Sequence, residues 1–209
     1  HHRAVHVLDR LPVAEGDLNE LMGHSVIQRR VTDPWLIGGR AFDLGVYVLV
    51  SEVAGAAGRS LRFSLFDDVL LRFCRAEFAS IAEATARVAH HSDAVADLER
   101  GWIIRDDYLS AWELPAFSPL LANATSRDAL AAAMSNRSSE AAVQRVWERV
   151  HGVVGRTLGA VHAAGAAPPH GEGGRFELLR YDFVVDAAAV PWLVEVNSGP
   201  NMAPRSTGQ

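Results

Sequence analysis

The chain has 209 residues, 49% of them hydrophobic and 22% charged, with a formal net charge of -5, which is typical of one globular domain, with room for two lobes. All 20 basic residues are arginine and form no basic block, which excludes a protein that grips nucleic acid by charge. Apolar runs such as residues 44–50 are far shorter than the roughly 20 residues of a membrane span, which excludes a transmembrane protein.

The first third of the chain is rich in predicted strands. Residues 5–8 and 25–28 have β-forming composition, and Asp33-Pro34 and Gly38-Gly39 then mark loops. Residues 41–53 are dense in Val, Leu, Tyr and Phe, which predicts a central strand buried on both faces. Residues 61–66 and 69–73 are two further predicted strands, on either side of a turn.

The middle of the chain changes to helical patterns. Residues 76–100 carry Ala, Glu and Arg at helical spacing, and residues 139–164 place a stripe of Val, Leu and Trp on one helical face. A serine precedes the second of these segments and is its expected N-cap. Residues 102–137 are mixed and broken by two prolines, and the Gly, Ala and Pro content of residues 164–174 predicts a flexible connection.

The last elements are two β-like runs, residues 176–185 and 192–196, which we expect to form a hairpin. Strands, then helices, then a strand pair predict an α+β fold with antiparallel or mixed sheets and flanking helices. The regular alternation of a doubly wound sheet is not present.

Three oxygen-bearing side chains of this hairpin form a candidate metal site. Glu195 and Asn197 lie two residues apart on a strand and therefore face the same side. Asp182 lies on the partner strand, so the three groups can converge, and carboxylate and amide oxygens are the ligands that Mg²⁺ prefers. The alternative that spacing leaves open is that they are strand-end residues facing solvent.

Two arginines near strand ends are candidate anion clamps. Arg40 precedes the central strand and Arg72 lies in a later one, and an arginine fork can bind two phosphate oxygens. The alternatives are solvated arginines or a local pairing of Arg40 with Asp43. The sequence contains no phosphate-binding glycine loop, no dinucleotide fingerprint and no Gly-x-Ser-x-Gly nucleophile motif.

The order of these motifs resembles the tubulin-tyrosine ligase-like family. The resemblance spans residues 5–204 and is specific in the last 30, where Asp182 and Glu195 lie thirteen residues apart and Glu195 opens a Glu-Val-Asn-Ser sequence. The segments that carry it are residues 26–30, 40–50, 71–73, 176–186 and 191–200.

This resemblance implies an ATP-grasp fold, in which two α+β lobes hold ATP between them. It implies one partial catalytic region over residues 1–209, truncated at its N-terminus. Its parts are a strand-rich nucleotide lobe at 1–75, a helical middle at 76–174 and a metal-binding hairpin at 175–204. The chemistry implied is activation of a carboxylate as an acyl phosphate, followed by attack of an amino acid's amine.

The resemblance also implies a role for each matching residue. Gln28 would lie beside the adenine, with Arg29, Arg30 and Val31 as the hinge backbone. Arg40 and Asp43 would complete the nucleotide site, Asp182, Glu195 and Asn197 would bind Mg²⁺, and Arg72, Asp182 and Glu195 would be catalytic. Gly45 departs from the family's Phe-Asp-x-Arg pattern, because it stands where the arginine is expected and supplies no charge.

The expected function is therefore an ATP- and Mg²⁺-dependent ligase that joins glutamate, glycine or tyrosine to tubulin or another acidic protein. A polyglutamylase- or glycylase-like member in the cytoplasm, at the cytoskeleton or cilium, is the main expectation, and the lone Cys74 fits a reducing compartment. One alternative is a catalytically degenerate member that binds nucleotide or tubulin. A weaker one is an ATP-grasp ligase with a small-molecule or peptide acceptor.

Overall fold

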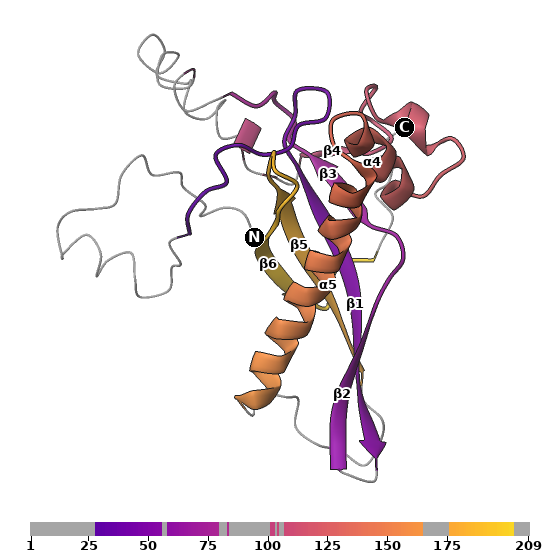
Figure 1. Ribbon diagram of the computed structural model, residues 1–209, viewed down its shortest axis with the longest axis vertical. Helices are drawn as coiled ribbons and strands as arrows, with labels where there is room; N and C mark the ends of the chain where they lie inside the picture. The colour runs from indigo at the N-terminus through magenta and orange to yellow at the C-terminus, as the bar shows by residue number, and fades with distance from the viewer. Residues whose placement is uncertain are drawn as a thin grey trace, which may run out of the picture.

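The computed structural model describes residues 28–55, 58–79, 83, 101–102, 104, 107–164 and 176–202. The described elements follow the expected order of strands, helices and a final strand pair (Figure 1). They are β1 (Phe42–Gly55), β2 (Gly58–Leu65), β3 (Leu70–Phe73), β4 (Leu109–Ser110), the 3-10 helix η2 (Ser118–Leu121), α4 (Ser126–Ser135), α5 (Glu140–Ala163), β5 (Phe176–Val185) and β6 (Pro191–Ser198).

Within the described residues, the strands form one six-stranded antiparallel sheet with β1 at its centre. One edge of β1 pairs with β5, and β6 continues the sheet beyond β5. The other edge pairs first with β3 and then, further along the strand, with β2. The mixed α+β architecture and the β5–β6 hairpin are therefore confirmed.

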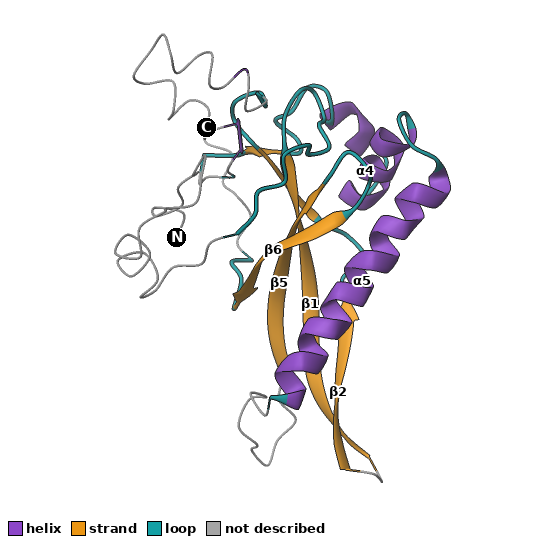
Figure 2. Cartoon of the chain, turned by 60° about the vertical axis from the view of Figure 1, so that its left-hand side comes forward, coloured by secondary structure: helices purple, strands orange, loops and turns teal. Residues whose placement is uncertain are grey.

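Helix α5 covers one face of this sheet (Figure 2). Ser139 caps it by accepting a hydrogen bond from the Ala142 amide, as the sequence predicts. Its buried stripe is Val143, Val146, Val150, Val154 and Leu158. Complete burial of each such side chain contributes about 1.5 to 3 kcal/mol, so this stripe is a main source of cohesion between the two layers.

The central strand β1 differs in one respect from its expected burial. Phe42, Leu44 and Val48 face the helices and are buried, and Asp43 on the opposite face is also buried. Leu49, however, keeps 44% of its surface exposed. Burial on both faces is therefore correct only for the first half of the strand.

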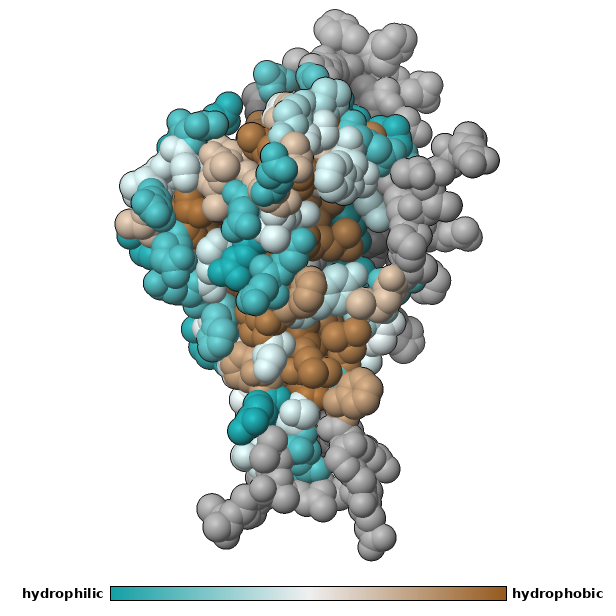
Figure 3. All heavy atoms as spheres, turned by 90° about the vertical axis from the view of Figure 1, so that its right-hand side faces the viewer, coloured by the Kyte–Doolittle hydropathy of each residue, from teal (hydrophilic) through white to brown (hydrophobic). Residues whose placement is uncertain are grey.

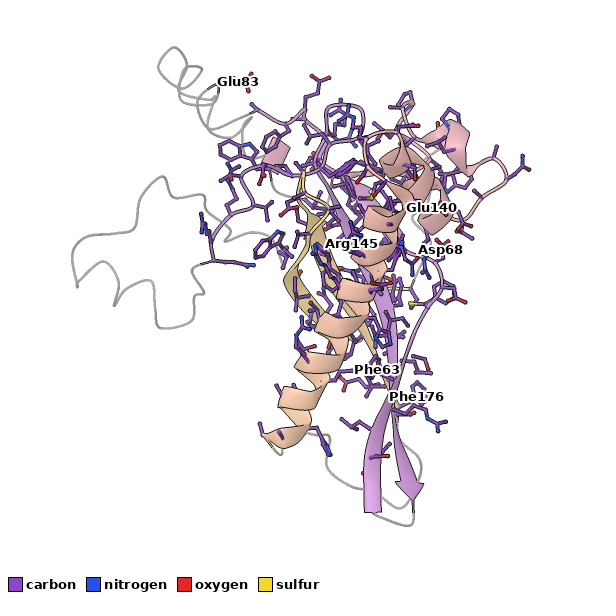
Figure 4. The ribbon with its side chains drawn as sticks, viewed as in Figure 1. Phe63, Asp68, Glu83, Glu140, Arg145 and Phe176 are labelled. Atoms are coloured by element: carbon purple, nitrogen blue, oxygen red, sulfur yellow. The ribbon has the colours of Figure 1, made fainter. Side chains whose placement is uncertain are left out.

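Helix α4 is the element that the mixed composition of residues 102–137 conceals. The Thr125 hydroxyl accepts a hydrogen bond from the Asp128 amide and donates one to the Asp128 carboxylate, so Thr125 is the N-cap of α4. Asp68, in the turn after β2, accepts a hydrogen bond of 3.0 Å from the Arg127 amide and so holds the start of α4 (Figure 4). Leu130 and Met134 complete the attachment by packing into the core.

Several expected elements lie outside the described residues, namely the strand at 5–8, nearly all of that at 25–28 and nearly all of the helix at 76–100.

On the described part of the surface seen in Figure 3, apolar residues gather in the lower half. None of the described helices has both the length and the apolar character that crossing a membrane requires.

Candidate functional site

A cluster of polar side chains lies on the face of the sheet opposite α5. It follows from strand alternation, because residues two apart on a strand face the same side. The cross-strand pairs that assemble it are Asp43 with Arg72, Gly45 with Asp182, Tyr47 with Arg180, Asp182 with Glu195, and Arg180 with Asn197.

Arg72 is buried at the centre of this cluster and forms ion pairs with two carboxylates. Its Nε donates to Asp43 Oδ1 at 2.9 Å and its Nη2 to Asp43 Oδ2 at 2.5 Å. The same Nη2 also donates to Asp182 Oδ2 at 2.9 Å. One arginine from β3 therefore ties together carboxylates from β1 and β5, and the side chains of all three residues are less than a tenth exposed.

Asp182 receives hydrogen bonds on both carboxylate oxygens. Arg180 donates from Nε to Oδ1 at 2.7 Å and from Nη2 to Oδ2 at 2.9 Å, which is a bidentate pair. The Asn197 amide donates to Oδ2 at 3.0 Å. Asp182 is thus held between two guanidinium groups and an amide, with only 2% of its surface exposed.

The charges of the cluster influence each other. Burial raises the pKa of Asp43 to about 7, although the charge and hydrogen bonds of Arg72 oppose the rise. Burial alone would lower the pKa of Arg72, but Asp43 and Asp182 reverse this and raise it. The hydrogen bonds to Asp182 raise the pKa of Arg180, against the effect of its own burial.

The raised pKa of Asp43 predicts a pH dependence of stability. The folded state binds the Asp43 proton more tightly than the unfolded state, so this group's contribution to stability falls as pH rises from about 4 to about 7. We expect Asp43→Asn to remove that fall. The free energy of unfolding, measured in urea between pH 4 and 8, checks this, with the exposed Asp67→Asn as control. Parallel pH profiles for Asp43→Asn and the native protein would contradict it.

The candidate metal ligands Asp182, Glu195 and Asn197 share this face, as the sequence predicts. A β-bulge lies between Asp182 and Phe183, so that Asp182 is opposite Glu195 while Phe183 is opposite Leu193. The donors are two carboxylates and one amide, which fit Mg²⁺ chemically. In the described part of the chain, no group of three His, Cys, Asp or Glu side chains has an arrangement that could hold a metal, so the set depends on the amide of Asn197.

The candidate hinge segment lies beside the same hairpin. Gln28 donates from Nε2 to the backbone oxygen of Leu193 at 3.3 Å, two residues from Glu195. Arg29 is exposed and Val31 is half-buried. The Arg30 guanidinium stacks 4.0 Å above the Trp102 ring, and burial lowers its pKa. The fold therefore brings the first candidate nucleotide residue close to the candidate metal ligands.

Arg40 is not part of the ion-pair cluster. Its guanidinium donates to the backbone oxygens of Cys74 and Arg75, which follow β3. The Asp43 carboxylate pairs with Arg72 instead. The local pairing of Arg40 with Asp43, which is one of the alternatives from the sequence, is therefore not formed. Arg40 remains half-buried at the start of β1.

Sequence reasoning did not assign Arg180 and Tyr47 to the site. A signal for Arg180 exists, because it lies two residues before Asp182 in an otherwise apolar strand and must face the same side. Tyr47 lies two residues after Gly45 and four after Asp43 on β1, so it must also face the same side as these residues. A hydrogen bond with Tyr47 further raises the pKa of Arg180, and the Tyr47 hydroxyl donates to the Asn201 backbone oxygen at 3.3 Å.

The fold and the cluster define a mixed α+β domain with paired acidic and basic side chains on one face of its sheet. The family model described as "Tubulin-tyrosine ligase family" matches residues 2–97 and 120–208, and the chain belongs to this family. The resemblance drawn from the motifs is confirmed.

Individual relatives are distant in sequence. A protein of Mus musculus described as "Probable tubulin polyglutamylase TTLL9" is 29% identical, over 87% of this chain and 34% of its own length. One of Caenorhabditis elegans, "Probable tubulin polyglutamylase ttll-15", is 24% identical, over 90% of this chain and 34% of its own. "Probable alpha-tubulin polyglutamylase Ttll1" of Tetrahymena thermophila is 24% identical, over 85% of this chain and 38% of its own length. The chain thus spans about a third of the length of these relatives.

Proposed function

We propose that this chain forms part of an ATP- and Mg²⁺-dependent ligase that joins an amino acid to a protein acceptor. The observation that carries the proposal is the placement of Asp182, Glu195 and Asn197 on one face of a hairpin, beside Arg72. Family membership adds support, because the named relatives are each described as a "probable" tubulin polyglutamylase.

The hinge segment and the arginines would bind the nucleotide. Gln28, whose side-chain amide donates to the Leu193 backbone oxygen of β6, would flank the adenine together with Arg29, Arg30 and Val31. Arg72 would turn its fork from the carboxylates to the phosphates, for which a guanidinium is well shaped. Arg40 would contribute positive charge at the start of β1, provided that the phosphates displace its backbone partners.

Asp182, Glu195 and Asn197 would hold Mg²⁺, which neutralises phosphate charge during phosphoryl transfer. Arg72 and Arg180 now occupy both oxygens of Asp182, so a metal ion alone must compete with two guanidinium groups. Phosphates offer these arginines a second partner and free the carboxylate. This arrangement favours binding of metal and nucleotide together rather than of the metal alone.

The reaction would transfer the terminal phosphate to an acceptor carboxylate, and the amine of the incoming amino acid would then attack the acyl phosphate and release phosphate. Fixed positive charge from Arg72 would stabilise the transferring group. The relatives' descriptions favour tubulin as the acceptor and glutamate as the amino acid, with glycine and tyrosine as the other candidates. A tubulin acceptor would place the protein at the cytoskeleton or cilium.

Glu195→Gln in the complete polypeptide tests this function. Glu195 is exposed, so its loss should leave the fold intact while weakening Mg²⁺-dependent ATP binding and reducing incorporation of labelled glutamate into tubulin. Glu148→Gln, on an exposed position of α5, is the matched control. Unchanged incorporation in Glu195→Gln would refute the metal role. Native protein that binds ATP without any transfer would instead support a nucleotide- or tubulin-binding module.

A further inference from the structure

Arg180 lies over the one glycine of the cluster. A Cβ atom on Gly45 would come within 3.0 Å of Arg180 Cδ and 3.3 Å of Asp182 Oδ1. Such contacts are tighter than most Cβ atoms make, so the Arg180 side chain would have to shift by a few tenths of an ångström to admit a larger residue at position 45. The arginine is on β5 and the glycine on the neighbouring β1.

The guanidinium of Arg180 retains donors for a ligand. A guanidinium has five N–H groups, and the bidentate pair with Asp182 uses one on Nε and one on Nη2. Tyr47 forms a further hydrogen bond with this side chain, which keeps 12% of its surface exposed. An anion on this face can therefore make its first contact with Arg180 while the pair with Asp182 is still formed, and the carboxylate is released afterwards.

The balance of charges in the cluster also favours phosphate binding by Arg180. The buried carboxylates of Asp43 and Asp182 are matched by the guanidinium groups of Arg72 and Arg180. Without Arg180 the cluster would carry an excess of negative charge and would repel a polyphosphate. Gly45 adds nothing to this balance, although the family pattern Phe-Asp-x-Arg has its arginine at that position.

We propose that Arg180 binds the terminal phosphates of ATP and so supplies from β5 the positive charge that Gly45 does not supply from β1. This inference rests on the proposed function and assigns a phosphate-binding residue within the same site. Its structural basis is the closeness of position 45 to the Arg180 side chain, because a long side chain at position 45 would need space that Arg180 now occupies. An arginine at position 45 and one at position 180 are then alternatives rather than additions.

The test exchanges the two residues in the complete polypeptide. Arg180→Gly should weaken MgATP binding about 10- to 100-fold, the effect of hydrogen bonds to a charged group, and leave AMP binding nearly unchanged. Gly45→Arg alone should not strengthen binding, because the new side chain meets Arg180 Cδ. The double variant Gly45→Arg/Arg180→Gly should recover most of the lost affinity for MgATP. Isothermal titration with MgATP and with AMP measures each affinity.

Two further variants make the result interpretable. Arg62→Gly removes an exposed arginine from β2 and should bind MgATP like the native protein. Arg180→Gln retains a polar side chain at position 180 if Arg180→Gly does not fold, and it should show the same selective loss for MgATP. Equal loss for MgATP and AMP, or no loss, in these Arg180 variants would overturn the inference while leaving the proposed function in place. Native protein that binds no MgATP would overturn both.

Discussion

Replacing Arg72 with methionine is expected to destabilise the fold by about 3 to 5 kcal/mol, the cost of breaking a buried ion pair. The change keeps most of the side-chain volume but leaves Asp43 without its guanidinium partner and Asp182 with one guanidinium instead of two. Since Arg72 joins β3 to carboxylates on β1 and β5, the loss affects three strands at once. Urea unfolding followed by circular dichroism measures it.

The matched control for Arg72→Met is Arg145→Met, on an exposed position of α5, which should cost less than about 0.5 kcal/mol. The double variant Arg72→Met/Asp43→Asn should be more stable than Arg72→Met, because it removes a buried carboxyl group that has lost its charged partner. If Arg72→Met is no more damaging than the control, the ion pairs described for Arg72 do not stabilise the protein.

Replacing Asp182 with asparagine should have the largest effect on activity. It removes the carboxylate shared by the proposed Mg²⁺ site and both arginines, so we expect at least a loss of about 100-fold in amino-acid transfer, comparable to misplacing a reacting group by 1 Å. Stability should also fall, since Arg72 and Arg180 lose a charged acceptor. Labelled glutamate incorporation and urea unfolding measure the two effects separately.

Comparison with Glu195→Gln makes the Asp182→Asn result specific. Glu195 is exposed whereas Asp182 is buried in ion pairs, so Glu195→Gln should lose activity with little loss of stability. Asp182→Asn should lose both. If Asp182→Asn loses stability but transfers amino acid at the native rate when folded, the role of Asp182 is structural only.

The sequence predicts those elements whose signals are local. The apolar stripe and serine cap predict α5, and the two β-like runs predict the β5–β6 hairpin. Helix α4 is missed because its short, alanine-rich segment has a weak apolar stripe, although the pair Thr125 and Asp128 marks its start. Apolar content alone cannot say which half of β1 is covered on both faces.

The candidate site is predicted only in part, because its contacts depend on the pairing between strands and not on local signals. The period of two residues places Glu195 with Asn197, but which side Asp182 shares with them depends on hairpin register. The partners of Asp43 depend on pairing between β1 and β3, so the sequence suggests nearby Arg40 while the structure uses Arg72, 29 residues away. Arg180 acquires significance only once β1 is known to place a glycine beside it.

The bulge in the final hairpin has a consequence for comparing relatives by alignment. Val194 is the extra residue, because Leu193 is opposite Phe183 and Glu195 is opposite Asp182. Deleting Val194 would produce a regular ladder and still present Glu195 and Asn197 beside Asp182. Homologues with one residue fewer between the aspartate and the glutamate can therefore keep these side chains on the same face, and a gap at this position in an alignment is no sign of lost chemistry.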